Sequence, residues 1–237
     1  MAAHITGIGW VTAAGMGCGR DHERFTMPDG HLPDIDPSGM FQKPYPNFRR
    51  MDAYSRLGLT AVAFALNDAG LAAYTVERPI GIIASTVYGC LGTDVDFYRT
   101  VIPEGGANAS PALFSYTLAN SFLGEAAIRY GLTGTNYVIT EQHPTGLAVV
   151  QTALDHVRRG DVAKILSGVC DVQCPGVFGK SSRVPPGAVF VMIEESFAPD
   201  ISPYGELTVN ADGGIIFDGS EIADITDLVQ KCLAKGR

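Results

Sequence analysis

Charged residues are scarce in this sequence: they make up 18% of the 237 residues, against roughly 25% in an average globular domain. This scarcity favours a chain that covers part of its surface with a second subunit. Basic residues are the rarer kind, with 17 Lys and Arg against 25 Asp and Glu. The resulting net charge of −8 has the wrong sign for binding a phosphate backbone, so we expect no nucleic acid among the partners.

Long apolar runs and a basic leader are lacking as well. No stretch approaches the ~18 consecutive apolar residues of a membrane-spanning helix, and the start MAAHITGIGWV has no basic residues before its apolar part. The five cysteines are odd in number and scattered, which does not suggest a disulfide framework. We therefore expect a cytoplasmic protein without a membrane span.

Motifs for metals and nucleotides are weak. The five histidines have no ligand spacing, and Cys170 and Cys174 lack a second cysteine pair, so we expect no metal and no cofactor. The segment 7–12, GIGWVT, resembles a dinucleotide fingerprint whose third glycine is replaced. His156, on the polar side of a predicted helix, is expected to be solvated.

Strand and helix patterns alternate along the chain. Short apolar runs predict strands at 4–8, 80–85, 136–140, 163–169, 188–194, 206–209 and 214–217. Segments rich in helix formers predict helices at 53–69, 93–101, 111–130 in two pieces, 145–159 and 221–235. This order predicts an α/β fold with parallel strand pairing.

Local signals mark the ends of several elements. Asp52 and Ser220 are expected to cap the helices that follow them. The glycines from Gly9 to Gly19 are expected to form a loop after the first strand, and the proline-rich stretch 27–47 a long excursion loop.

The segment EQHPTGL, Glu141–Leu147, places several polar residues between a strand end and a helix start. The free N–H groups of a helix N-terminus can hold an oxyanion or depress the pKa of a nucleophile. Pro144 suits the first helical turn. Two interpretations remain open: Gln142 or His143 caps the helix, which these residues alone favour, or one of them takes part in catalysis.

Several segments, in family order and spacing, resemble the N-terminal half of the β-ketoacyl-ACP synthases: ITGIGWVTAAG, MDAYSRLGLTAVAFALNDAGL, IGIIASTVYGCLG, LFSYTLANSFLGEAAIRYGLTGTN and ILSGVCD. The resemblance implies a thiolase-like fold, in which two similar α/β halves stack as five layers around two buried helices. For this chain it implies one α/β half-fold, a mostly parallel mixed sheet with helices on both faces. It covers about residues 1–198 and leaves 199–237 as an extension of short strands and a helix.

Two departures from the family pattern bear on function. The family's nucleophilic cysteine lies in a segment such as TACSSGL, and aligning its Gly-Leu pair with this sequence puts His143 at the cysteine. A shift of one residue puts Gln142 there, and glutamine at this position, often after glutamate, marks chain-length-factor and decarboxylating relatives. The family's second half, which supplies two catalytic histidines, is not found in this sequence, and residues 202–237 are too short to replace it.

The resemblance therefore implies a truncated, non-condensing homologue that acts as a chain-length-factor-like or scaffolding subunit in fatty-acid or polyketide-type biosynthesis. The alternative is an acyltransferase or malonyl-thioester decarboxylase of altered chemistry, in which His143 acts as base or acyl acceptor or Gln142 polarises the thioester. The expected partners are a second copy or a β-ketoacyl synthase, with acyl carrier protein as a further candidate.

The expected assembly depends on the predicted helix 145–159. Its apolar stripe consists of Leu147, Val150, Leu154 and Val157. In the family this helix is buried between sheets, and the strand at 136–140 pairs with its copy at a dimer two-fold. Either the C-terminal helix or a second chain must cover the stripe, and the low charged fraction favours mainly a second chain.

Overall fold

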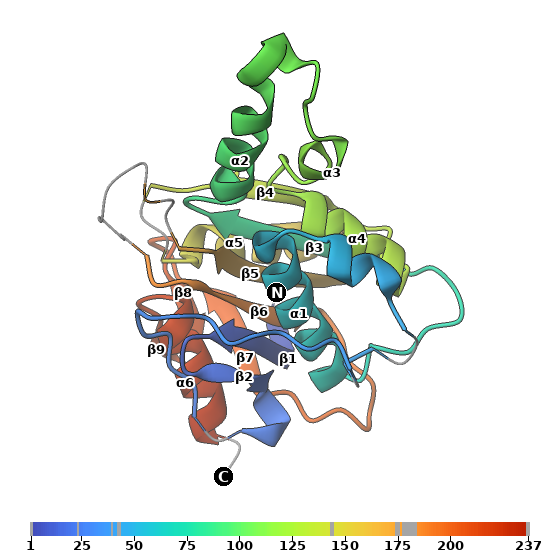
Figure 1. Ribbon diagram of the computed structural model, residues 1–237. Coiled ribbons are helices and arrows are strands. Elements are labelled where there is room, and N and C mark those ends of the chain that lie inside the picture. Colours follow the sequence, from blue (N-terminus) through green and yellow to red (C-terminus); the bar gives the residue numbers. More distant parts are fainter. Residues whose placement is uncertain are drawn as a thin grey trace.

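The computed structural model describes residues 2–22, 24–38, 40–41, 44–142, 145–173, 176 and 184–235. In this part of the chain, nine strands form one sheet in the order β4-β3-β5-β6-β1-β7-β8-β9, with β2 paired to β1 (Figure 1). The strands are β1 (Ala3–Thr12), β2 (Gly15–Cys18), β3 (Ile80–Thr86), β4 (Asn136–Thr140), β5 (Lys164–Asp171), β6 (Gly187–Glu194), β7 (Gly205–Val209), β8 (Ile215–Phe217) and β9 (Ser220–Glu221).

Helices cover both faces of this sheet, which confirms the predicted α/β fold class. The α-helices are α1 (Ala53–Asp68), α2 (Leu91–Val101), α3 (Pro111–Phe114), α4 (Ser121–Tyr130), α5 (Leu147–Arg158) and α6 (Ile225–Lys235), with 3-10 turns η1 (Gly19–Asp21), η2 (Pro46–Arg50) and η3 (Pro103–Gly106). Successive side chains of β6 point to opposite faces of the sheet and so mark the two helical layers. Val189 and Val191 belong to the apolar cluster that contains α5 and α6, whereas Phe190 and Met192 belong to the cluster that contains α1 and α4. None of the helices in the described residues is long and apolar enough to cross a membrane.

Parallel pairing is confined to the two neighbours of β3. Strand β3 pairs in parallel with β4 and β5, while β5–β6, β6–β1 and the remaining pairs of named strands are antiparallel. The parallel share of the sheet is thus smaller than the sequence predicts, because β6, the next strand along the chain after β5, runs antiparallel beside it.

Most of the predicted helices and strands are present in the structure. Some of them begin or end at other residues than the capping and glycine signals in the sequence predict. Asp52 caps α1 by accepting a hydrogen bond from the Ser55 amide at 2.9 Å, and the predicted break in 111–130 separates α3 from α4. Two predictions are wrong. The glycine-rich stretch after the first strand continues β1 and forms β2, and Ser220 belongs to β9 instead of capping a helix.

The apolar stripe of α5 packs on the sheet, mainly against β5 and β3, with α6 on the same face. Val150, Leu154 and Val157 of α5 are at most 1% exposed and belong to one apolar cluster with residues of the sheet and of α6. The expectation that mainly a second chain covers this stripe is therefore wrong, because the chain's own sheet, together with α6, does so. The predicted division after residue 198 stays a prediction.

Candidate functional site

The polar segment between β4 and α5 lies at the carboxyl end of the parallel strands. Glu141 donates its backbone N–H to the carbonyl of Thr86, at the end of β3, over 2.9 Å. Gln142 is exposed to solvent, whereas His143 and Pro144 lie outside the described residues. The catalytic role predicted for Gln142 or His143 therefore stays a prediction.

The described N-terminus of α5 lies at Gly146, and the capping predicted for Gln142 or His143 stays a prediction because His143 lies outside the described residues. The Leu147 amide donates to the Thr145 hydroxyl at 3.2 Å, and the N-cap is Gly146, with φ of 70°. A Cβ on Gly146 would lie 2.9 Å from side-chain atoms of both Val169 and Ile225. The helix thus begins later than residue 145, at a position where the backbone conformation and the contact with α6 both require glycine.

A cavity of about 240 Å³ adjoins this junction. It lies between the start of α5, the end of β5 and the start of α6, and its lining is Met27, Thr145, Val169, Asp171, Val184, Pro185, Asp224, Ile225 and Thr226. Small-molecule sites generally measure about 300 to 1,000 Å³. The cavity is therefore small for an acyl chain, although its hydroxyl and carboxylate groups suit a small polar ligand.

Asp171 organises the neighbouring turn after β3. Its carboxylate accepts hydrogen bonds from the Thr86 hydroxyl at 2.8 Å and from the amides of Val87 and Tyr88 at 3.0 and 2.7 Å. Burial raises the pKa of the Asp171 carboxyl, and these hydrogen bonds oppose the rise. Asp171 thereby fixes the turn that follows β3. The sequence does not indicate this role, because the residues that Asp171 bonds lie some 85 positions away in the chain.

The cysteines that the structure describes do not supply a nucleophile at this site. The segment 141–147 contains no cysteine, and the four cysteines among the described residues, Cys18, Cys90, Cys170 and Cys232, are all buried. Burial raises the pKa of the Cys90 thiol to about 12 and that of the Cys170 thiol well above its ordinary value. None of these described thiols offers an exposed thiolate nucleophile at neutral pH.

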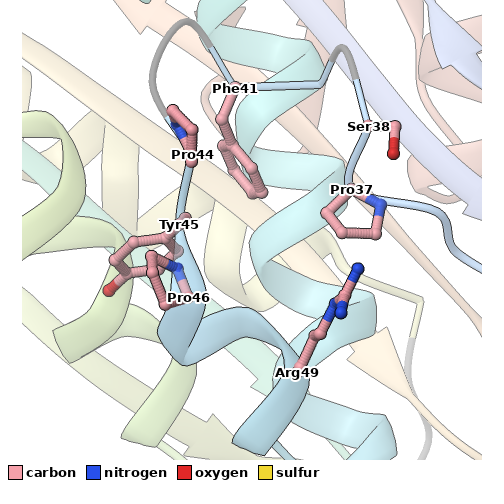
Figure 2. A pocket seen from close by; sticks show the side chains of 7 residues that line it. All are labelled: Pro37, Ser38, Phe41, Pro44, Tyr45, Pro46 and Arg49. Atoms are coloured by element: carbon pink, nitrogen blue, oxygen red, sulfur yellow. The ribbon is translucent and has the colours of Figure 1, made fainter.

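A second, more open pocket lies in the proline-rich loop before α1 (Figure 2). Its volume is about 460 Å³, and its lining is Pro37, Ser38, Phe41, Pro44, Tyr45, Pro46 and Arg49. The Arg129 guanidinium lies 5.5 Å from the ring centres of both Phe41 and Tyr45, and the Tyr45 hydroxyl bonds to Glu125. The lining is mostly proline and aromatic side chains, and its one cationic member is Arg49. Such a lining suits an aromatic or anionic group. The sequence predicts the loop but not the pocket.

His156 on α5 forms hydrogen bonds with a residue of the edge strand β4 and with a residue of the turn that follows α5. Its Nε2 lies 2.8 Å from the hydroxyl of Tyr137 on β4, and its Nδ1 lies 2.9 Å from Asp161 Oδ2. The His156 side chain is only 14% exposed. The prediction of a solvated histidine is wrong, since helical periodicity places the residue on the polar face without showing the neighbours it bonds.

Replacing His156 by alanine is expected to lower the free energy of unfolding at pH 7 more than at pH 3. The hydrogen bond from His156, with a second from Arg159, holds the pKa of the Asp161 carboxyl below its usual range. A depressed folded-state pKa stabilises the fold above the unfolded-state pKa, near ~3.9, and this contribution is lost as pH falls through the folded-state value. Urea unfolding at both pH values measures the difference.

Tyr137→Phe is the control for this prediction. It removes the bond to Nε2 and keeps the pair of His156 with Asp161, so its cost should be the same at both pH values. An equal cost of His156→Ala at pH 7 and pH 3 would contradict the proposed linkage.

The sequence model of the β-ketoacyl synthase N-terminal domain matches residues 28–186, which is most of the chain. The chain belongs to the β-ketoacyl synthase family. The match includes the β4–α5 junction, the turn held by Asp171 and the loop that carries the second pocket.

Individual members of the family show how far the similarity extends. A Streptomyces virginiae protein described as a polyketide β-ketoacyl synthase is 31% identical over 132 residues, which are 52% of this chain and 31% of that protein. The chain thus spans only about a third of the length of this curated relative.

Solved structures of the family share the fold. The ishigamide ketosynthase/chain length factor gives a TM-score of 0.68 at 18% identity, covering 90% of this chain and 68% of that one. One chain of the complex of the ketosynthase ApeO with its chain length factor ApeC, from Xenorhabdus doucetiae, gives a TM-score of 0.61 at 16% identity. This match covers 84% of the present chain and 81% of the chain in the complex. At these identities the similarity establishes a thiolase-like fold.

Proposed function

We propose that this family member does not condense acyl groups and serves as a chain-length-factor-like or scaffolding subunit of a ketosynthase, in fatty-acid or polyketide-type biosynthesis. The observation that carries the proposal is the β4–α5 junction, where the family's nucleophile position falls on Gln142 or His143. The predicted cytoplasmic location stays a prediction.

The surroundings of the junction support a non-condensing role. The adjacent cavity of about 240 Å³ is below the usual size for a substrate site, and α6 packs directly on the N-cap of α5 at Gly146. The described cysteines are buried, so none of them replaces the missing nucleophile. A subunit of this kind would act by binding its synthase, and acyl carrier protein remains an expected further partner.

The purified protein is expected to gain no acyl mass when it is incubated with acyl-ACP. Intact-mass spectrometry of the wild-type chain, alone and with its synthase, measures this directly. The variants Gln142→Cys and His143→Cys restore a thiol at the two candidate positions. Acylation of one variant would identify the position of the family's nucleophile, whereas acylation of the wild-type chain would overturn the non-acylating role.

The second candidate function is malonyl-thioester decarboxylation or acyl transfer by Gln142 or His143. It is favoured by the polar residues of the junction, because backbone N–H groups at the start of a helix can stabilise an enolate or oxyanion. Decarboxylation of malonyl-ACP by the wild-type chain that is lost in Gln142→Ala or His143→Ala would establish it. Decarboxylation that persists in both variants would exclude both residues.

A further inference from the structure

The pocket in the proline-rich loop lies on the other face of the sheet from the β4–α5 junction. Phe41 and Tyr45, which line it, pack on the apolar cluster that contains α1 and α4. The cavity at the junction is lined by Val169 and Ile225, which belong to the cluster that contains α5 and α6. The pocket is therefore a separate site, and its volume of about 460 Å³ is within the range of about 300 to 1,000 Å³ that small-molecule sites have.

Contacts with the rest of the molecule hold the walls of this pocket in place. The centre of the Phe41 ring lies 5.7 Å from that of Tyr45 and 5.5 Å from that of the buried Phe48. From α4, Glu125 accepts a hydrogen bond from the Tyr45 hydroxyl, and the Arg129 guanidinium lies against the Phe41 and Tyr45 rings. Proline residues, whose φ is fixed, supply much of the remaining lining. The pocket is thus formed before a ligand arrives, which lowers the entropic cost of binding.

The apolar part of the pocket suits a flat, rigid group. In Figure 2 the Phe41 ring points into the space between Pro44 on one side and Pro37 on the other. An aromatic ligand can pack on the Phe41 ring in an offset or edge-to-face arrangement, and the two proline rings add apolar surface beside it. A flexible alkyl chain would gain similar contacts but would lose more rotational freedom on binding. The lining therefore favours an aromatic ligand over an aliphatic one.

Arg49 gives the pocket one positive charge. Its side chain rises from η2 towards Pro37 in Figure 2, and within the part of the chain that the structure describes it forms no hydrogen bond or ion pair. The nearby carboxylate is that of Asp36. Hydrogen bonds from Ser38 lower the pKa of the Asp36 carboxyl most, and the charge of Arg49 lowers it least. Asp36 is thus engaged mainly by Ser38, and the planar guanidinium of Arg49 is available to bind a carboxylate through two parallel hydrogen bonds.

We propose that this pocket binds a small aromatic carboxylate, with the ring of the ligand packed on Phe41 between the prolines and its carboxylate paired with Arg49. The ligand would connect the loop before η2 to η2 itself, and it would stabilise the folded chain by mass action. The inference does not depend on the proposed function, because no residue of the β4–α5 junction lines this pocket.

The test is isothermal titration calorimetry of the full chain with naphthoate, with its uncharged amide and with decanoate. Naphthoate should bind to one saturable site, and the other two compounds should bind at least fivefold more weakly. Arg49→Gln should weaken naphthoate binding at least tenfold, since a charge-assisted hydrogen-bonded pair is lost, and should leave the binding of the amide unchanged. Arg50→Gln is the matched control, because Arg50 is the neighbouring exposed arginine and does not line the pocket. It should bind naphthoate within twofold of the wild type.

Phe41→Leu tests the aromatic contact, because it removes the ring and keeps an apolar side chain. A variant that melts at the wild-type temperature should bind naphthoate at least fivefold more weakly, and if it unfolds, the comparison of naphthoate with decanoate decides the same point. A wild-type chain that binds no naphthoate at millimolar concentration would overturn the site. Equal losses in Arg49→Gln and Arg50→Gln would overturn the pairing with Arg49, and decanoate binding as tight as that of naphthoate would overturn the aromatic preference. All of these failures would leave the proposed function standing.

Discussion

Deleting residues 220–237 is expected to make the protein insoluble. Ile225, Leu228, Val229 and Leu233 of α6 are buried against the sheet and α5. Full burial of each side chain contributes about 1.5 to 3 kcal/mol, so their loss removes about 6 to 12 kcal/mol from a total stability of about 5 to 15 kcal/mol. The deletion also removes cover from the apolar cluster that α6 shares with the sheet and α5. The soluble fraction after expression measures the effect.

Point variants in α6 distinguish the loss of its buried side chains from the mere shortening of the chain. Leu228→Asp buries an unpaired carboxylate at a fully buried position and should lose the cooperative unfolding transition or precipitate. Ala234→Asp places the same side chain at an exposed position of the same helix and should change stability by less than about 1 kcal/mol. A soluble, cooperatively folded deletion variant would show that the fold does not depend on α6.

Gly9→Ala is expected to destabilise the fold by at least about 3 kcal/mol. A Cβ on Gly9 would lie 2.2 Å from the Ala65 amide nitrogen and 2.4 Å from the Ala61 carbonyl oxygen. These are backbone atoms of α1, so the clash can be relieved only by moving the helix away from β1. Thermal or urea unfolding monitored by circular dichroism measures the cost.

The matched control is Gly124→Ala on α4. A Cβ there meets no heavy atom within 4 Å, so the change should be neutral or stabilising by up to about 1 kcal/mol. A Gly9→Ala variant as stable as the wild type would show that this glycine has no packing role. The resemblance of GIGWVT to a dinucleotide fingerprint would then be the remaining explanation for the glycine. The close contact of β1 with α1 explains this glycine without a nucleotide.

The family, the α/β class and the position of most elements could be predicted from the amino-acid sequence alone. Apolar periodicity reports which face of a segment is buried, and this is how the strand Asn136–Thr140 and the stripe on α5 could be predicted. The capping of α1 by Asp52 also follows from local signals, because the cap and its partner Ser55 are three residues apart. The departure at Gln142 and His143 needs only the sequence and the family pattern.

Which segments cover each of these faces follows from the three-dimensional structure. Periodicity shows that α5 has an apolar stripe but not that the chain's own sheet, with α6 on the same face, buries this stripe. His156 gains its partners from β4 and from the turn after α5, and Gly9 is needed because α1 crosses β1 closely. These are contacts between segments distant in sequence, and their energies depend on three-dimensional packing that no local pattern records. The same holds for Tyr98 and Ile102, apolar side chains in and directly after α2 that are each 63% exposed.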